Sequence, residues 1–297
     1  MKDIMVGIIG LDTSHSIEFT RRLQAPDCPA DQKVKGMKAV KCLRFPSPFQ
    51  TEPDQDKRQQ QMEQWGVKVT RDFKEAADGV DTLMLEINDP SPHLEYFKKA
   101  AGLGKPVFLD KPPADTMENA KEIFSIAAGS KVRVFSASSL RFAPQVLEIS
   151  REFSRPKICM AVGPLGQAPA GSSVVWYGVH AVEMLERVMG TGAEKVFARK
   201  DGCGAIACVE YKGGRRGIIQ LNEGVYHYGI YCHDEKGMKF LAVDTSFIYT
   251  DLLKEIIKFF SGGEPPARPE DSLEVQAILN AIDVSITSGK EQILTAD

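Results

Sequence analysis

MVGIIGLDTSHS, residues 5–16, sets the fold of the first half of the chain. Residues 5–11 form a continuous apolar run, which is typical of a strand buried inside a parallel sheet. Asp12, Thr13 and Ser14 follow and offer N-cap side chains to a helix that extends to about residue 22. A buried strand that leads directly into a helix predicts the first crossover unit of an α/β sheet.

The same alternation continues outward to about residue 140. Apolar runs predict strands, and amphipathic stretches between them predict helices. The predicted strands cover residues 39–45, 67–70, 80–87, 106–110 and 132–137, and the main predicted helices cover 92–101 and 115–128. Strands and helices in this order predict a Rossmann-type, doubly wound parallel sheet.

The pattern changes after Arg141. Strand-like runs now follow one another, joined by Gly-rich turns, and predict an α+β domain with a mostly antiparallel open sheet. These runs cover residues 157–162, 195–199, 205–211, 216–222 and 226–233, with helices over 180–189 and from about 247 and 272. We therefore predict two domains, residues 1–140 and 141–297.

The composition favours a small-molecule partner. Of 297 residues, 43% are hydrophobic and 26% charged, and the net charge of -3 argues against nucleic-acid binding. The apolar run near the N-terminus is too short to span a membrane, and it lacks the flanks of a signal peptide. Six scattered cysteines without a CxxC pair indicate reduced thiols, so we expect a cytoplasmic protein.

Four motifs in order resemble the glucose–fructose oxidoreductase, inositol dehydrogenase and MocA (Gfo/Idh/MocA) family. They are HLEYFKKAAGLGKPVFLDKPPA (93–114), RFAP (141–144), WYGVHAVE (176–183) and RPEDSLEVQAILNAIDVSITSGKEQIL (268–294). The resemblance implies an NAD(P)-binding Rossmann domain and a second domain for substrate binding and oligomerisation. It also implies an oxidoreductase that transfers hydride between the nicotinamide and a CH–OH group of a sugar, cyclitol or related polyol.

Two residues are implied as catalytic. Lys111 matches the family lysine beside the nicotinamide, flanked by Asp110 and Pro112 as cofactor contacts. His180 matches the family histidine and would handle the hydroxyl proton together with Lys111. Without the resemblance, Lys111 is better explained as a solvated loop lysine, and His180 as a capping or packing residue at a helix start.

Three residues are implied as substrate contacts, and two of them depart from the family pattern. Arg141 opens the link between the domains. Trp176 replaces the first family aspartate, and Glu183 replaces the second. Trp176 either stacks on an apolar sugar face or belongs to the core.

The largest departure is in the first glycine loop. Dinucleotide-binding folds use G-x-G-x-x-G, whereas this chain has Gly10, Asp12 and His15 at the glycine positions. A carboxylate about 4–5 Å from a phosphate costs about 1–4 kcal/mol. Either His15 as imidazolium offsets Asp12, or the phosphates sit differently, or no dinucleotide binds. Gly10, Asp12, Thr13 and His15 are the predicted contacts, although Asp12 and Thr13 also suit simple helix capping.

Arg44 follows the second predicted strand, where NAD-binding proteins place an acid on the ribose hydroxyls. An arginine there suits a 2′-phosphate and favours NADP over NAD, although a surface arginine explains it equally well. His180 and Glu183 lie one helical turn apart, but no third ligand is placed by the spacing, so we predict no metal.

Apolar residues at alternate positions of the second sheet, among them Ile206 and Ile218, predict an interface, and Ile219 is predicted to point outward. The family resemblance implies a homodimer or homotetramer through this sheet. Two other functions stay open: a non-redox ligand-binding or regulatory protein that has lost dinucleotide chemistry, and elimination or glycoside cleavage that uses tightly held NAD.

Overall fold

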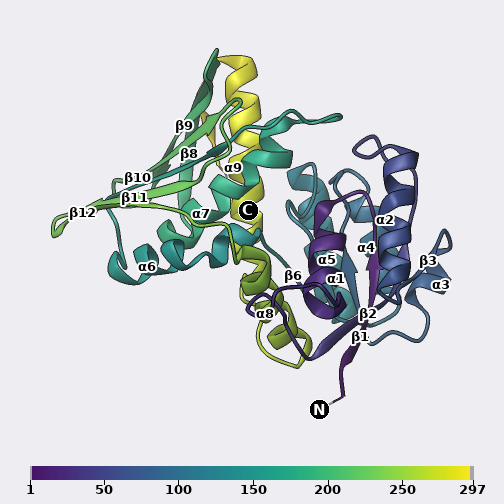
Figure 1. Cartoon of the computed structure of the whole chain (residues 1–297). Coiled ribbons are helices and arrows are strands. Elements are labelled where there is room, and N and C mark those ends of the chain that lie inside the picture. Colours follow the sequence, from purple (N-terminus) through teal and green to yellow (C-terminus); the bar gives the residue numbers. More distant parts are fainter. Residues whose placement is uncertain (1, 295–297) are drawn as a thin grey trace. The chain divides into compact units, whose positions relative to one another are not determined.

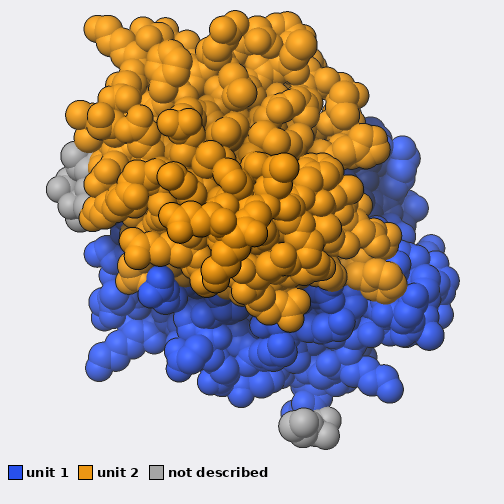
Figure 2. All heavy atoms as spheres, turned by 90° about the vertical axis from the view of Figure 1, so that its left-hand side faces the viewer, with its two compact units in different colours: residues 1–114, 118–136, 249–268 blue, residues 115–117, 137–248, 269–297 orange. Residues whose placement is uncertain are grey.

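The computed structural model describes residues 2–294, which divide into two compact units (Figures 1 and 2). Unit 1 contains the residues up to 114, together with 118–136 and 249–268. Unit 2 contains residues 115–117, 137–248 and those from 269 onward. The sequence predicts one boundary between two domains, at residue 140. In the structure, the later segment 249–268 also belongs to unit 1.

Unit 1 contains the predicted doubly wound parallel sheet. Its six strands have the order β3-β2-β1-β4-β5-β6, and every neighbouring pair is parallel. The strands are β1 (Ile4–Ile9), β2 (Met37–Leu43), β3 (Lys68–Thr70), β4 (Thr82–Leu85), β5 (Val107–Leu109) and β6 (Val134–Ser136). The crossover helices are α1 (Ser14–Gln24), α2 (Glu52–Gln64), α3 (Phe73–Ala77), α4 (His93–Ala101) and α5 (Met117–Ser130).

The register of the three central strands brings their last residues side by side. Ile9 pairs with Leu85, and Leu85 pairs with Leu109. The residues that come next in the chain, Gly10 and two acids, therefore lie together at the carboxyl edge of the sheet. In open α/β sheets this edge is where ligands bind.

One later helix returns to unit 1. Most of α8 (Ile248–Phe260) belongs to it, together with the segment that follows. The Phe259 ring meets the Phe135 ring edge-on at 4.9 Å, and the Arg133 guanidinium lies 4.5 Å from the centre of the Phe259 ring. The helix thus covers the end of the sheet at β6.

Unit 2 contains a seven-stranded sheet of order β12-β11-β7-β10-β9-β8-β13. All pairs are antiparallel except β7 with β10, so the predicted mostly antiparallel sheet is confirmed. The strands are β7 (Ile158–Pro164), β8 (Ala193–Asp201), β9 (Gly204–Tyr211), β10 (Arg215–Asn222), β11 (Gly229–Asp234), β12 (Gly237–Ala242) and β13 (Gln292–Ile293). The helices are α6 (Pro144–Glu152), α7 (Val179–Met189) and α9 (Pro269–Ser288), and α7 and α9 lie along one face of the sheet (Figure 1).

The two faces of this sheet differ. Ile219 and Leu221 point to the face under the helices and are buried, at 1% and 2% exposure. On the other face, Phe197, Ile206 and Phe240 are 47%, 44% and 58% exposed. The assignment of Ile219 as outward was therefore wrong by one residue, because side chains alternate along a strand and Ile218 holds the outward position.

No helix among residues 2–294 combines the length and apolar character needed to cross a bilayer. The six cysteines are free thiols.

Candidate functional site

The loop after β1 is closed by its own side chains. Asp12 is 1% exposed, and its two carboxylate oxygens accept hydrogen bonds from the Ser47 hydroxyl (2.6 Å) and the Asn88 backbone N–H (3.0 Å). Burial raises the pKa of the Asp12 carboxyl. Asp12 thus joins the loops that follow β1, β2 and β4. Thr13 is the N-cap of α1, and its hydroxyl accepts the His15 N–H.

Gly10 is required by packing whether or not a ligand binds. Its φ is +116°, and a Cβ built there would lie 2.1 Å from the backbone oxygen of Glu86. Side-chain-bearing residues rarely adopt this backbone region, and the contact leaves no space for one. The glycine that the sequence analysis assigned to the phosphates therefore also holds β1 close to β4.

Arg44 is buried, at 4% exposure, and is held by α2. Its guanidinium pairs with Glu52, lies 2.6 Å from Asp56 and donates to Gln59 at 2.9 Å. The positive charge that was offered to a 2′-phosphate is thus already opposed by two carboxylates. A second arginine, which sequence reasoning missed, lies closer to the glycine loop: Arg58 donates to the Leu11 carbonyl at 3.0 Å.

The carboxyl ends of β4 and β5 carry two buried acids next to a histidine. His15 Nδ1 lies 2.9 Å from the Asp110 carboxylate and 3.8 Å from Glu86. Although burial opposes ionisation of Asp110, the facing His15 lowers the pKa of its carboxyl. Burial and the nearby Asp110 charge raise the pKa of Glu86 well above its ordinary value. Glu86 was missed because an acid that ends an apolar run has no local motif.

Lys111 lies next to this group. It is 6% exposed, its backbone N–H donates to the Asp110 carboxylate at 2.8 Å, and its peptide bond to Pro112 is cis. It is therefore no solvated loop lysine. The structure places Asp110, Lys111 and Pro112 at the carboxyl end of β5, as the sequence analysis expected.

In unit 2, His180 is held at the start of α7. Its Nδ1 lies 2.7 Å from the Ser138 hydroxyl, and the Ser138 backbone N–H donates to Glu183 at 3.2 Å. Glu183 thus fixes the segment that holds the imidazole. Burial raises the pKa of Glu183 to about 7.

Arg141 is engaged within the same unit. Its guanidinium pairs with Glu186, lies 3.1 Å from Glu183 and lies 3.8 Å from Asp271, and the residue is 3% exposed. These contacts make Arg141 the counter-charge of a buried acidic group. Its predicted contact with a substrate stays a prediction.

Aromatic rings surround His180 on several sides. A π-helical turn, Val174–Gly178, leads into α7 and carries Trp176 and Tyr177. The Tyr177 ring lies 5.2 Å from the His180 ring and 5.1 Å from Trp176, and Tyr228 lies 6.0 Å from His180. Tyr226, which is 65% exposed, adds an edge contact with Tyr177 at 6.3 Å.

A strand is predicted over residues 226–233, and for its first three residues this is wrong. Strand β11 begins only at Gly229, so Tyr226 and Tyr228 belong to the preceding loop. Their proximity to His180 depends on a loop and a π-turn, and neither has a periodic signal in the sequence.

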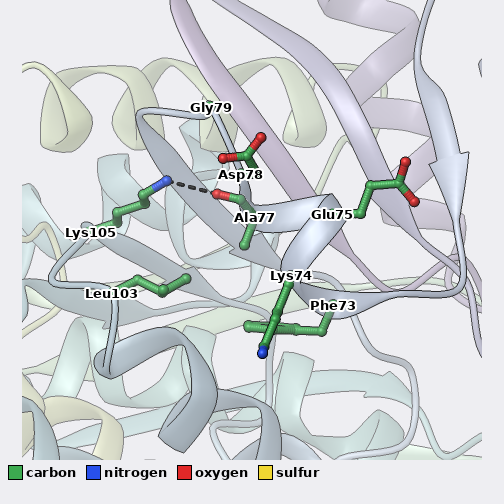
Figure 3. A pocket seen from close by; sticks show the side chains of 8 residues that line it. All are labelled: Phe73, Lys74, Glu75, Ala77, Asp78, Gly79, Leu103 and Lys105. Carbon is green, nitrogen blue, oxygen red and sulfur yellow. Dashed lines mark hydrogen bonds between the residues drawn. The ribbon is translucent and has the colours of Figure 1, made fainter.

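A surface pocket near the opposite edge of the unit 1 sheet contains none of the predicted site residues. It is lined by Phe73, Lys74, Glu75, Ala77, Asp78, Gly79, Leu103 and Lys105 (Figure 3). The Lys105 ammonium donates to the Ala77 and Val80 carbonyls at 2.8 and 2.7 Å, so its charge is used to hold the loop before β4. The pocket carries no chemistry that we can assign.

A family model matches part of the chain, and solved structures share its fold. Residues 51–138 match the GFO_IDH_MocA model, described as an oxidoreductase family with an NAD-binding Rossmann fold. In sequence, the chain matches none of the curated proteins.

Solved structures share the fold over almost the whole chain. A putative myo-inositol dehydrogenase from Sinorhizobium meliloti has a TM-score of 0.80 and 15% identity, covering 98% of this chain and 100% of its own. A myo-inositol dehydrogenase from Corynebacterium glutamicum has a TM-score of 0.81 and 13% identity over 100% of both chains. A scyllo-inositol dehydrogenase from Lactobacillus casei, solved with NAD(H) and scyllo-inositol, has a TM-score of 0.80 and 14% identity, covering 98% and 99%.

Proposed function

We propose that this chain is an NAD(P)-dependent oxidoreductase of the Gfo/Idh/MocA type, and the family-model match over residues 51–138 supports this resemblance. Its substrate would be a sugar, cyclitol or related polyol, oxidised or formed at a CH–OH group. The observation that carries the proposal is the buried Lys111 at the carboxyl end of β5, in a sheet of Rossmann order. The bound scyllo-inositol of the Lactobacillus casei relative supports the substrate class.

The residues of the first loop fit a dinucleotide, with one difference from the usual loop. Gly10 lacks a side chain, and the positive end of α1 begins directly after the Thr13 cap, as a pyrophosphate requires. The Asp12 carboxylate accepts two hydrogen bonds from neighbouring loops, and these donors offset part of its negative charge. The repulsion expected from the sequence is therefore reduced.

The preference for NADP over NAD depends on Arg44. A 2′-phosphate would replace Glu52 and Asp56 as the partner of its guanidinium, so binding needs one anion to exchange for another. We retain the NADP preference as a prediction.

The chemistry divides between the cofactor and the side chains. The nicotinamide, when bound, exchanges hydride with the carbon that carries the hydroxyl group. His180 takes or returns the hydroxyl proton, and Ser138 orients its imidazole. Lys111 assists by placing a cationic group at the end of β5. Trp176 and Tyr177 offer ring faces to the C–H groups of the polyol.

A titration of the purified protein with NAD, NADH, NADP and NADPH tests the proposal. We expect at least one of the four to bind, and polyol-dependent reduction of the oxidised form to follow with a panel of inositols and sugars. Absence of binding by all four would overturn it. The non-redox alternative would then be favoured, in line with Asp12 and His15 at two glycine positions of the first loop and with Trp176 in place of an aspartate.

We also propose that the protein forms a homodimer, or a tetramer of dimers, through the open face of the unit 2 sheet. Phe197, Ile206 and Phe240 expose apolar surface there, and Met238, on the same strand as Phe240, is 73% exposed. Such a continuous apolar face normally marks a protein interface. The six free thiols support a reducing compartment such as the cytoplasm.

A further inference from the structure

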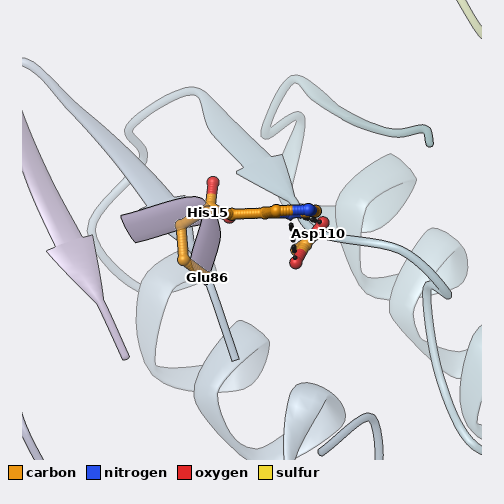
Figure 4. A group of neighbouring side chains, drawn as sticks. All are labelled: His15, Glu86 and Asp110. Carbon is orange, nitrogen blue, oxygen red and sulfur yellow. Dashed lines mark hydrogen bonds and ion pairs between the residues drawn. The ribbon is translucent and has the colours of Figure 1, made fainter. Parts of the chain in front are cut away.

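Three buried side chains meet at the carboxyl edge of the unit 1 sheet: His15 from the first turn of α1, and Glu86 and Asp110 from the positions just after β4 and β5. His15, Glu86 and Asp110 are 4%, 0% and 1% exposed (Figure 4). One ligand atom from each lies within 4.8 Å of the other two. All three belong to unit 1, where they follow β1, β4 and β5.

Glu86 has an unsatisfied carboxylate. Neither of its oxygens has a hydrogen-bond partner among the described residues, although the side chain is fully buried. Burial of an ionised carboxylate without hydrogen bonds is strongly unfavourable, so such groups are normally paired, protonated or bound to a metal.

The positive groups near Glu86 do not satisfy it. His15 Nδ1 lies at 3.8 Å, but the same nitrogen is 2.9 Å from Asp110 and is already used there. The Lys111 ammonium acts on Glu86 through charge, without a hydrogen bond. Two carboxylates and one imidazole thus face a common point, and one carboxylate has no donor.

We propose that His15, Glu86 and Asp110 bind a divalent transition-metal ion. One imidazole nitrogen and two carboxylate oxygens suit Zn²⁺ or Mn²⁺. Bonds of about 2.1 Å in tetrahedral geometry separate ligand atoms by about 3.4 Å. The observed separations of 2.9 and 3.8 Å lie on either side of this value. The three protein ligands leave a fourth position for water or a substrate oxygen.

The surroundings already orient two of the three ligands. The His15 ring packs against Phe19 at 5.4 Å and Tyr249 at 5.2 Å, which directs Nδ1 toward the acids. The Lys111 N–H holds one oxygen of Asp110 at 2.8 Å. Such outer contacts are typical of metal sites, where they fix the ligands before the ion binds.

The prediction of no metal was based on ligands at short spacings along the sequence. These three residues are separated by 71 and 24 positions and meet only because β1, β4 and β5 are neighbours in the sheet. The inference does not rest on the proposed redox activity, and each can fail without the other.

The test is zinc binding by the full-length protein after dialysis against a chelator. Isothermal titration and metal analysis should show one Zn²⁺ per chain, and Co²⁺ should produce a visible d–d spectrum. Glu86→Gln keeps the shape of the side chain and should weaken Zn²⁺ binding about 100-fold or more, because loss of even an outer contact costs 10–100-fold. Glu274→Gln, at a partly buried carboxylate of unit 2, is the matched control and should bind as the wild type does.

Stability of the metal-free proteins separates loss of a ligand from loss of the fold. Glu86→Gln replaces a buried carboxyl group that has no hydrogen-bond partner, so its metal-free melting temperature should equal or exceed that of the wild type, while Zn²⁺ should raise only the wild-type value. A wild-type protein that binds neither Zn²⁺ nor Mn²⁺ would overturn the proposal. So would Zn²⁺ binding that is unchanged in Glu86→Gln, or binding that Glu274→Gln also removes.

Discussion

Glu183→Gln should remove a large pH-dependent contribution to the stability of unit 2. The pKa of Glu183 is raised from 4.5 to about 7, and burial is the main cause. The folded state therefore holds this proton more tightly than the unfolded state does. The stabilisation is complete below about pH 4.5 and is lost as the pH rises toward 7. About 2.5 pKa units at 1.36 kcal/mol each correspond to a loss of about 3 kcal/mol.

Urea unfolding at about pH 5 and about pH 8 measures this loss. The chain has two tryptophans, so the replacement Trp65→Phe leaves Trp176 as a fluorescent reporter of unit 2. Part of the loss has already occurred at pH 5, so the difference in unfolding free energy between the two pH values should be about 2.5 kcal/mol smaller in Glu183→Gln than in its parent. Other titrating groups contribute equally to both proteins and cancel.

The glutamine keeps an oxygen that can accept the Ser138 N–H, and Arg141 keeps its pair with Glu186. Glu75→Gln, at an exposed carboxylate of unit 1, should leave the difference unchanged and serves as the control. An equal pH dependence in Glu183→Gln and its parent would refute the reasoning. Arg141 would then keep Glu183 ionised across the whole range.

Three further predictions concern activity, packing and assembly. Lys111→Ala and His180→Ala should each lower polyol turnover by about 10²–10⁴-fold in a nicotinamide absorbance assay, with unchanged circular dichroism; full activity in either variant would exclude that residue from the chemistry. Gly10→Ala should lose on the order of 3 kcal/mol of unfolding free energy or fail to fold. The control Gly66→Ala, at a positive φ with open space around it, should lose about 1–2 kcal/mol. Equal losses in the two variants would mean that the close approach of Gly10 to the Glu86 backbone does not matter. Ile206→Arg, on the open sheet face, should give a monomer by light scattering while the melting temperature changes little; an unchanged oligomer would move the interface elsewhere.

The elements of unit 1 could be predicted because each buried parallel strand is a short apolar run. The run of residues 80–87 contains β4, for example, although the strand itself covers only Thr82–Leu85. Strand β12 was missed because its residues are mostly exposed and lack the alternation that marks a half-buried strand. Helix α6 was missed because it directly follows the 3₁₀ turn at Ser139–Phe142 and begins at a proline.

The candidate site was predictable only where one residue belongs to a recognisable motif. Lys111 and His180 were found in this way. Glu86 and Ser138 contribute through tertiary proximity: one follows a buried strand, and the other holds His180 from 42 positions away. Arg44 and Arg141 stand out in the sequence, but the sequence does not show which acids pair with them. Arg44 pairs with Asp56 on α2, and Arg141 lies near Asp271 on the distant helix α9.

The return of residues 249–268 to unit 1 determines the order in which the protein can fold during synthesis. A chain that has reached residue 140 has all six parallel strands but lacks Phe259, whose ring covers Phe135 beside β6. It also lacks Thr250, whose hydroxyl accepts a hydrogen bond from the buried Arg22 at 3.2 Å. Unit 1, although it begins first, is therefore completed only after the strands of unit 2 up to β12 have left the ribosome. A fragment cut at residue 140 would expose apolar surface that the intact chain buries, and separate expression of unit 1 requires α8 to be attached to it.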